Sequence, residues 1–225
     1  MILFADCGNT AVKFALGSSR VRMLPDPQLF DQWLNNRVAE ELILLPGAAH
    51  ASNVVRQWWT KTVRIVGTDI ALPECGQYPG MGLDRIVAGL ATPPGSIVID
   101  AGTATTLTVW GTDGRFAGGL IMPSPQAMIA GLSVRAPALP APEPADSSAR
   151  AAQHDTRGAI AAAAGIGHPA MVAACVERLR QETHLERVVI TGGGADELVR
   201  SGRMPGMEQR PWLVLEGMEM LSKRS

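Results

Sequence analysis

Near its N-terminus the chain reads Ile2-Leu3-Phe4-Ala5-Asp6-Cys7-Gly8-Asn9-Thr10, and the order of these residues is the strongest clue to the fold. The apolar start predicts a buried strand, the polar residues predict a tight turn, and the mostly apolar run 11–16 predicts a returning strand. The same plan recurs about half a chain later, in Ser96-Ile97-Val98-Ile99-Asp100-Ala101-Gly102-Thr103-Ala104. Two copies in matching contexts predict two related α/β halves that face each other across a cleft.

Composition narrows the class of protein. The 225 residues carry 20 basic and 21 acidic side chains, a net charge of -1 that excludes nucleic-acid binding driven by bulk charge. The 46% hydrophobic content argues against disorder, and apolar runs shorter than the ~20 residues of a membrane span predict no membrane segment. Three separated cysteines and the lack of a basic N-terminal region predict no disulfide framework, no four-thiolate zinc site and no secretory signal. We therefore expect a soluble cytoplasmic protein.

Helix-like and strand-like segments alternate after the first hairpin, which predicts α/β sheets covered by helices. Helices are expected at 25–36, 50–61, 83–91, 125–134 and 156–182, with the last interrupted near 165–169. Strands are expected at 41–45, 62–66, 96–99, 105–110, 115–122 and 187–190, and the chain should end in a strand at 212–215 and a helix at 217–223. The expected domains are 1–93 and 94–225, each with one copy of the repeated motif.

The turn residues of both copies suit phosphate binding. Gly8 and Gly102 lack a Cβ, so their backbone can approach a ligand closely and direct N–H groups at phosphate oxygens. Asn9, Thr10 and Thr103 add side-chain donors. For one copy alone, an ordinary Asx-rich hairpin turn is the better explanation of the pattern. Its repetition favours the phosphate site.

The carboxylates at the strand ends need a different explanation, because a carboxylate repels phosphate. Asp6 and Asp100 are suited to hold a cation or a water, or to take a proton. Lys13, on the returning strand, can bring an ammonium group toward phosphates. The sequence thus combines two carboxylates, one ammonium group and two glycine turns, which are the elements of phosphoryl transfer.

Two further motifs add to this set. Gly192 and Gly193 lie in a run of three glycines after an apolar strand, where a flat ligand could pass close to the backbone. A tight helix-entry turn without a ligand is the alternative. Gly82-Leu83-Asp84-Arg85 offers a guanidinium for an acidic group and a carboxylate that can accept a hydroxyl proton, although a helix cap beside a solvated residue would also explain it.

Together these motifs resemble the type III pantothenate kinases, also called Bvg accessory factor-like proteins, of the actin-like sugar-kinase superfamily. The resemblance is carried, in order, by Asp6 to Lys13, Gly82 to Arg85, Asp100 to Thr106, Gly118-Gly119-x-Ile121-x-Pro123 and Thr191-Gly192-Gly193. It implies duplicated actin-like (ribonuclease H-like) domains, each a mixed sheet flanked by helices. The implied reaction is ATP-dependent phosphorylation of pantothenate, the first step of coenzyme A biosynthesis.

The resemblance also implies residue roles, cofactors and a partner. Asp6 to Lys13 would form the first phosphate loop, Thr103 would contact ATP, and Gly102, Gly192 and Gly193 would complete the nucleotide site. Gly82, Leu83, Asp84 and Arg85 would hold pantothenate, with Asp84 as the proton acceptor and Thr156 and Tyr78 as further substrate contacts. Asp100 would bind a monovalent cation, potassium or ammonium, and Asp6 would assist Mg²⁺ with ATP. A homodimer is expected.

Three positions differ from the family pattern: Ser124 follows Pro123 where Gly is usual, Asp155 precedes Thr156 where Asn is common, and Thr108 lies where an acidic residue is expected. These departures keep open a regulatory homologue that binds ligand without turnover. A third hypothesis is an actin-like phosphohydrolase that passes phosphate to water.

Overall fold

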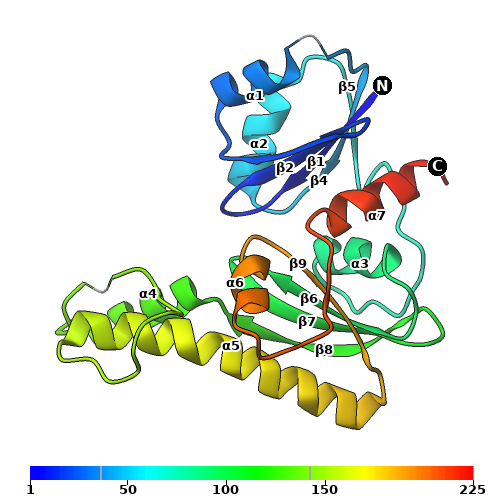
Figure 1. Cartoon of the computed structure of the whole chain (residues 1–225). Coiled ribbons are helices and arrows are strands. Elements are labelled where there is room, and N and C mark those ends of the chain that lie inside the picture. The colour runs from blue at the N-terminus through cyan, green and yellow to red at the C-terminus, as the bar shows by residue number, and fades with distance from the viewer. Residues whose placement is uncertain (36, 142, 225) are drawn as a thin grey trace. The chain divides into compact units, whose positions relative to one another are not determined.

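The computed structural model describes residues 1–35, 37–141 and 143–224, and the chain divides into two compact units (Figure 1). Unit 1 comprises Met1–Pro93, Gly114–Phe116 and Trp212–Ser225. Unit 2 comprises Pro94–Asp113 and Ala117–Pro211. Each unit is built around one five-stranded mixed sheet.

The sheet of unit 1 has the strand order β3-β2-β1-β4-β5. Its strands are β1 (Ile2–Cys7), β2 (Val12–Leu16), β3 (Ser19–Met23), β4 (Glu41–Leu45) and β5 (Thr62–Ile65). The first three form an antiparallel meander, and β4 pairs with β1 and β5 with β4 in parallel. The helices of this unit are α1 (Pro27–Leu34), α2 (Ala49–Trp58), α3 (Leu83–Leu90) and α7 (Leu213–Ser222).

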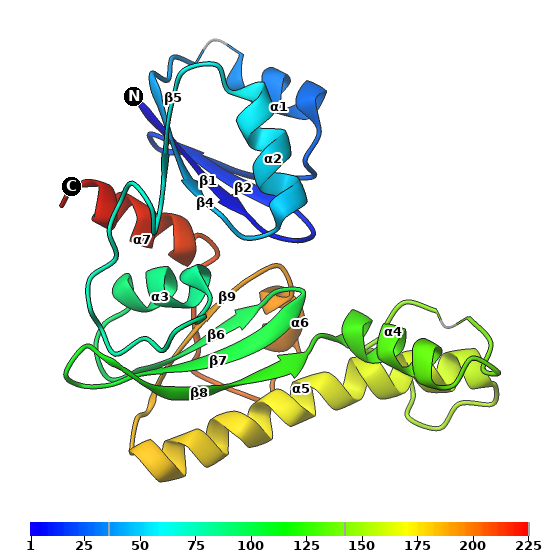
Figure 2. The same ribbon diagram turned by 180° about the vertical axis from the view of Figure 1, so that it is seen from behind.

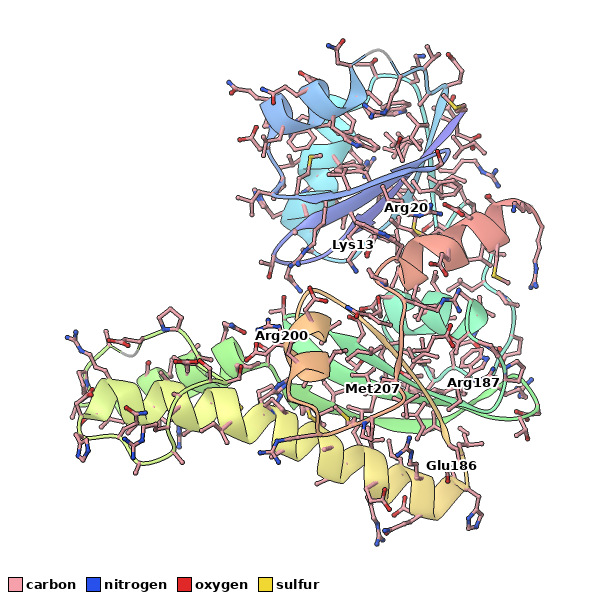
Figure 3. All side chains as sticks on the ribbon, in the orientation of Figure 1. Lys13, Arg20, Glu186, Arg187, Arg200 and Met207 are labelled. Carbon is pink, nitrogen blue, oxygen red and sulfur yellow. The ribbon has the colours of Figure 1, made fainter. Side chains whose placement is uncertain are left out.

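Alternation along β1 separates the core of unit 1 from the face that carries Asp6. Leu3, Ala5 and Cys7 are fully buried in a cluster that includes residues of α1 and α2. Since successive side chains of a strand point to opposite faces, Asp6 lies on the other face of the sheet. Helices α3 and α7 pack against each other, and α7 lies along β1 and β2. Figure 3 shows Lys13 and Arg20 beside α7, where Arg20 pairs with Glu219 at 2.8 Å.

The sheet of unit 2 has the order β8-β7-β6-β9-β10. Its strands are β6 (Ser96–Ala101), β7 (Ala104–Trp110), β8 (Phe116–Pro123), β9 (Arg187–Thr191) and β10 (Glu208–Gln209). As in unit 1, the central strand has an antiparallel neighbour on one side (β7) and a parallel neighbour on the other (β9). Numbered within each sheet, both orders read 3-2-1-4-5. The duplicated α/β architecture expected from the repeated motif is confirmed.

The core of unit 2 lies between its sheet and the helices α5 (Thr156–Thr183) and α6 (Ala195–Arg200). By length and mean hydropathy α5 could cross a membrane, but its residues Val172, Val176 and Leu179 belong to this core. That is the position of a core helix in a soluble protein. Both views show α4 (Pro125–Arg135) and the N-terminal part of α5 extending beyond the sheet (Figures 1 and 2).

Two predictions about helices were wrong. The expected break at 165–169 is absent: α5 runs unbroken from Thr156 to Thr183 with Pro169 inside it. Proline removes one backbone donor, a loss that a long packed helix can absorb. Gly165 does not break the helix but is required by packing. The connector between α4 and α5 contacts the helix at this point, so a Cβ on residue 165 would lie 2.2 Å from the backbone carbonyl carbon of Asp146.

The C-terminal strand expected at 212–215 is also absent, because Leu213–Ser222 form a single helix, α7. Its apolar start is buried on several sides, including Leu213, Val214 and Leu215. A short continuous apolar run does not distinguish a buried strand from a buried helix. Strands β3 and β10 were not predicted at all. Strand β3 contains no fully buried residue and β10 has only two residues, so both give little sequence signal.

Candidate active site

In unit 1 the hairpin between β1 and β2 holds the first predicted phosphate loop. Asp6 and Lys13 are cross-strand partners, with Lys13 Nζ 3.6 Å from Asp6 Oδ2 and both side chains 13% exposed. Burial raises the pKa of the Asp6 carboxyl above its ordinary value. The Lys13 charge opposes this rise, and the negative charge of Asp84 adds to it. The structure thus brings three of the predicted site residues into one electrostatic cluster on one face of unit 1.

The loop that follows β4 supports this hairpin from the side. The Ala48 N–H donates to the Cys7 carbonyl oxygen at 2.8 Å. A Cβ on Gly47 would lie only 2.3 Å from that same oxygen, so this close approach requires glycine. Gly47 was missed in the sequence analysis. The signal was present: Pro46-Gly47 follows the strand 41–45 as Gly192-Gly193 follows the strand 187–191.

The predicted substrate motif forms the start of α3. Gly82 is its N-cap, and Asp84 is exposed in the first turn, where the partial positive charge of the helix N-terminus favours a carboxylate. Asp84 Oδ1 accepts the backbone N–H of Arg85 at 2.9 Å. A Cβ on Gly82 would lie 2.5 Å from that oxygen, so glycine leaves room for the Asp84 carboxylate in this position. Leu83 packs toward Gly67.

Arg85 is held by two aromatic residues of unit 1. Its side chain turns into the protein, and the residue is 6% exposed. Arg85 Nη1 donates to the Tyr78 hydroxyl at 2.9 Å, and the guanidinium carbon lies 5.5 Å from the centroid of the Phe116 ring. The Tyr78 ring is itself exposed and 5.7 Å from that of Phe116. The structure therefore brings the predicted substrate contacts Tyr78 and Arg85 together.

In unit 2 the second hairpin places Asp100 at the end of β6, on the face opposite α5 and α6. Its cross-strand partners are Thr106 on β7 and Thr191 on β9. Gly192 has φ +93°, and a Cβ there would lie 2.5 Å from both Asp100 Oδ1 and the Ala101 carbonyl oxygen. Only glycine fits this backbone position. Asp100 and the glycine run are therefore adjacent.

The remaining predicted residues lie in turns or at a helix start. Asn9, Thr10, Gly102, Thr103 and Gly193 are exposed at the tips of their turns, and Gly8 is partly exposed. Thr156 is the exposed first residue of α5, at the end of the helix that extends beyond the sheet of unit 2 (Figure 2). The structure does not bring Thr156 to the second hairpin of its own unit.

The predicted site residues can supply single carboxylate ligands for the expected cations, but not a complete set of ligands. Within the described ranges, no group of three or more His, Cys, Asp or Glu side chains could form a metal cage. Mg²⁺ in nucleotide sites commonly needs only one or two carboxylates and takes its other ligands from phosphates and water. The single carboxylates of Asp6 and Asp100, each beside a glycine turn, match that requirement.

Comparison with known proteins identifies the family. A family model described as type III pantothenate kinase matches residues 2–178. The chain belongs to the type III pantothenate kinase family. The enzyme of that name from Synechococcus elongatus is 28% identical over 191 residues, which cover 83% of this chain and 72% of the relative. The one from Thermosynechococcus vestitus is 34% identical over 163 residues, 69% of this chain and 63% of the relative.

Solved structures agree on the fold. A conserved protein of Campylobacter jejuni, described as a Baf family transcriptional activator, superposes with a TM-score of 0.67 at 19% identity, over 99% of this chain and 98% of its own. The inorganic polyphosphate/ATP-glucomannokinase of Arthrobacter sp. strain KM gives 0.51 at 14% identity, over 100% and 99%. At such identities the likeness concerns the fold alone, and it confirms the duplicated actin-like architecture.

Proposed function

We propose that this protein transfers the γ-phosphoryl group of ATP to the primary hydroxyl of pantothenate, the first step of coenzyme A biosynthesis. Family membership supports the reaction. The structural observation that carries the proposal is the cluster of Asp6, Lys13 and Asp84, in which a buried carboxylate faces an ammonium group and is coupled to an exposed carboxylate at a helix start. Burial and neighbouring like charges that shift the pKa of a carboxyl group are concentrated at functional sites, and this supports the assignment.

Asp84 is the proposed general base. Its carboxylate is exposed, and its position is fixed by the hydrogen bond to the Arg85 N–H. It would accept the hydroxyl proton as the pantothenate oxygen attacks phosphorus, while Arg85 and Tyr78 hold the substrate from the same unit. Positioning of this kind supplies much of the rate in phosphoryl transfer, because the reaction needs little covalent chemistry from the protein.

Phosphate binding is assigned to the turns of both hairpins. The backbone N–H groups around Gly8 and Gly102 and the side chains of Asn9, Thr10 and Thr103 are the proposed donors, with Lys13 as the ammonium group. Gly192 and Gly193 are assigned to the rest of the nucleotide, where the absence of side chains permits close approach. The halves 1–93 and 94–225 would thus each supply one phosphate loop.

Two cations complete the proposal. Asp6 would hold Mg²⁺ that enters with ATP, and Asp100 would hold potassium or ammonium. When bound, these ions neutralise negative charge on the phosphates. Asp100 is suited to this task because its register neighbours Thr106 and Thr191 carry hydroxyl oxygens, which are cation ligands.

A second copy of the chain is the proposed partner. Thr156 begins α5 at the end that extends beyond the sheet, away from the other residues assigned to unit 2 (Figure 1). If Thr156 contacts pantothenate, a homodimer offers a way for it to complete a site in the partner. The protein would act in the cytoplasm, since its substrate and ATP are small soluble molecules.

The decisive experiment replaces the proposed base. Asp84→Asn keeps the shape of the side chain and its acceptor for the Arg85 N–H, but it cannot take a proton at neutral pH. We expect kcat to fall by a factor on the order of 10²–10⁴ with nucleotide binding within about twofold of wild type. Turnover is measured by a coupled ATP assay with pantothenate, Mg²⁺ and K⁺, and nucleotide binding by calorimetry.

Asp31→Asn is the matched control, because Asp31 is an exposed carboxylate on α1 of the same unit. It should leave both quantities unchanged. An Asp84→Asn protein that retains wild-type turnover would contradict the assignment. If the wild-type protein binds ATP and pantothenate without product, the regulatory alternative is favoured. Hydrolysis of ATP without any need for pantothenate would indicate the phosphohydrolase instead.

A further inference from the structure

Phe116 is an aromatic residue at the point where a strand of unit 2 begins. It begins β8, yet Gly114–Phe116 belong to unit 1 by their contacts. The Phe116 N–H donates to the Cys75 carbonyl oxygen at 2.7 Å, and a Cβ on Gly76 would approach the Phe116 carbonyl oxygen to 3.2 Å. The backbone of Phe116 is thus fixed against the loop that carries Tyr78.

This placement puts the Phe116 ring against the guanidinium of Arg85. The guanidinium carbon lies 5.5 Å from the ring centroid, within the range of a cation–π contact. The hydrogen bond from Arg85 Nη1 to Tyr78 adds a second constraint, which acts on one N–H edge. A ring contact and an edge contact together restrict both the place and the direction of a planar group.

We propose that Phe116 is a positioning residue that holds the Arg85 guanidinium for the carboxylate of the substrate, and so determines the preference for an acidic pantoyl amide over a neutral one. The inference rests on the proposed function, because it concerns the same substrate site. Arg85 makes the contact with the substrate, and Phe116 acts through Arg85. The residue carries no charge or polar side-chain atom, so motif reasoning about chemistry does not select it.

The physical reason is that a guanidinium binds a carboxylate well only when their planes and edges match. A long side chain has many rotamers, and ordering it on binding costs affinity. The Phe116 ring removes part of this cost before the substrate arrives. Its loss should therefore weaken binding of the charged substrate and leave the chemical step, which depends on Asp84, nearly unchanged.

The test compares Phe116→Leu with Phe116→Tyr, using pantothenate and its neutral primary amide as substrates. Leucine keeps apolar bulk but lacks a ring face, whereas tyrosine keeps the face. We expect Phe116→Leu to raise KM for pantothenate roughly three- to thirtyfold, the range of one cation–π contact, with kcat and KM for ATP within about twofold. KM for the amide should hardly change, so the preference for the acid shrinks. Phe116→Tyr should restore it.

Controls separate positioning from general damage. Phe30→Leu removes a buried ring from the core of the same unit, where Phe30 packs on Phe14 and Trp58, and should lower stability without changing the preference. If Phe116→Leu does not fold, Phe116→Met fills the space flexibly and takes its place. An unchanged acid-to-amide preference in an active, folded variant overturns the inference and leaves the proposed function intact. A wild-type protein that phosphorylates neither compound overturns the proposed function itself.

Discussion

The two hairpins that begin the two sheets are supported by the same backbone hydrogen bond, although residues 8–11 form the first turn and residues 102–104 the shorter second one. In unit 1 the Ala48 N–H donates to the carbonyl oxygen of Cys7, the residue after Asp6, at 2.8 Å. In unit 2 the Gly194 N–H donates to the carbonyl oxygen of Ala101, the residue after Asp100, also at 2.8 Å. The loop after the parallel neighbour strand therefore supports the central hairpin identically in both halves.

The side chains around the two carboxylates differ. Asp6 is flanked by Lys13 on one strand and by Leu45 on the other. Asp100 is flanked by Thr106 and Thr191. One hairpin thus carries its own positive charge beside the carboxylate, whereas the register neighbours of the other supply hydroxyl groups. The comparison teaches that one supporting backbone contact can hold two carboxylates in different electrostatic surroundings.

The largest expected effect comes from filling the space that Gly192 leaves beside Asp100. Gly192→Ala would place a methyl group 2.5 Å from Asp100 Oδ1 and force an alanine into φ +93°. We expect the free energy of unfolding to fall by about 2–5 kcal/mol, from overpacking and backbone strain together. Activity should fall further than stability explains, because the Asp100 carboxylate must move. Urea unfolding and turnover at saturating K⁺ measure the two effects.

Gly47→Ala is the matched change in unit 1 and sharpens the comparison. Its methyl group would meet the Cys7 carbonyl oxygen at 2.3 Å, but Gly47 is not among the glycines with a positive φ. The expected loss is about 1–3 kcal/mol, from overpacking alone. Equal losses in the two variants would show that backbone strain at Gly192 contributes nothing.

A moderate effect is expected from neutralising Asp6. Burial raises the pKa of the folded-state carboxyl above 3.8, so the unfolded chain releases the proton first and ionisation costs stability. This cost grows as pH rises from 3.8 through the folded-state pKa and persists above it. Asp6→Asn does not titrate, and should therefore be more stable than wild type at pH 7, with the difference shrinking as pH falls through the folded-state pKa and absent below pH 3.8. Unfolding in urea across this pH range measures it.

Phosphoryl transfer should nevertheless be lost in Asp6→Asn, because the proposed Mg²⁺ contact is removed. A site that costs stability and supplies activity is common among enzymes. If Asp6→Asn were less stable than wild type at pH 7, the attraction between Asp6 and Lys13 would exceed the cost of burying the Asp6 carboxylate. The two residues would then form an ion pair that stabilises the hairpin of unit 1.

Sequence reasoning succeeded where local patterns repeat and was incomplete where packing decides. The two Asp-x-Gly hairpins and strand β4 were predicted because apolar runs and turn residues mark them directly. A helix was predicted at 217–223, but the start of α7 was predicted as a strand because burial on several sides erases helical periodicity. The contact of Phe116 with Arg85 joins residues 31 positions apart, and no local pattern predicts such a contact. The roles of the individual site residues stay predictions.

The smallest effect is expected at Cys7, whose counterpart in the second hairpin is Ala101. Cys7 is fully buried, and burial raises the pKa of its thiol to about 12. Because the thiolate is the reactive form, a thiol reagent at pH 8 should leave Cys7 unmodified in the folded protein, with or without ATP. Mass spectrometry of the peptide Met1–Lys13 checks this, with the urea-unfolded protein as the positive control.

Cys7→Ala copies the second hairpin into the first. Removing one buried atom should cost about 1 kcal/mol and leave KM for ATP unchanged, since the backbone N–H groups of the turn remain in place. Rapid labelling of Cys7 in the folded protein would mean that the first hairpin opens without unfolding of the unit. In that case the two hairpins would differ in rigidity as well as in charge, and the supporting hydrogen bond that they share would hold only in the closed state.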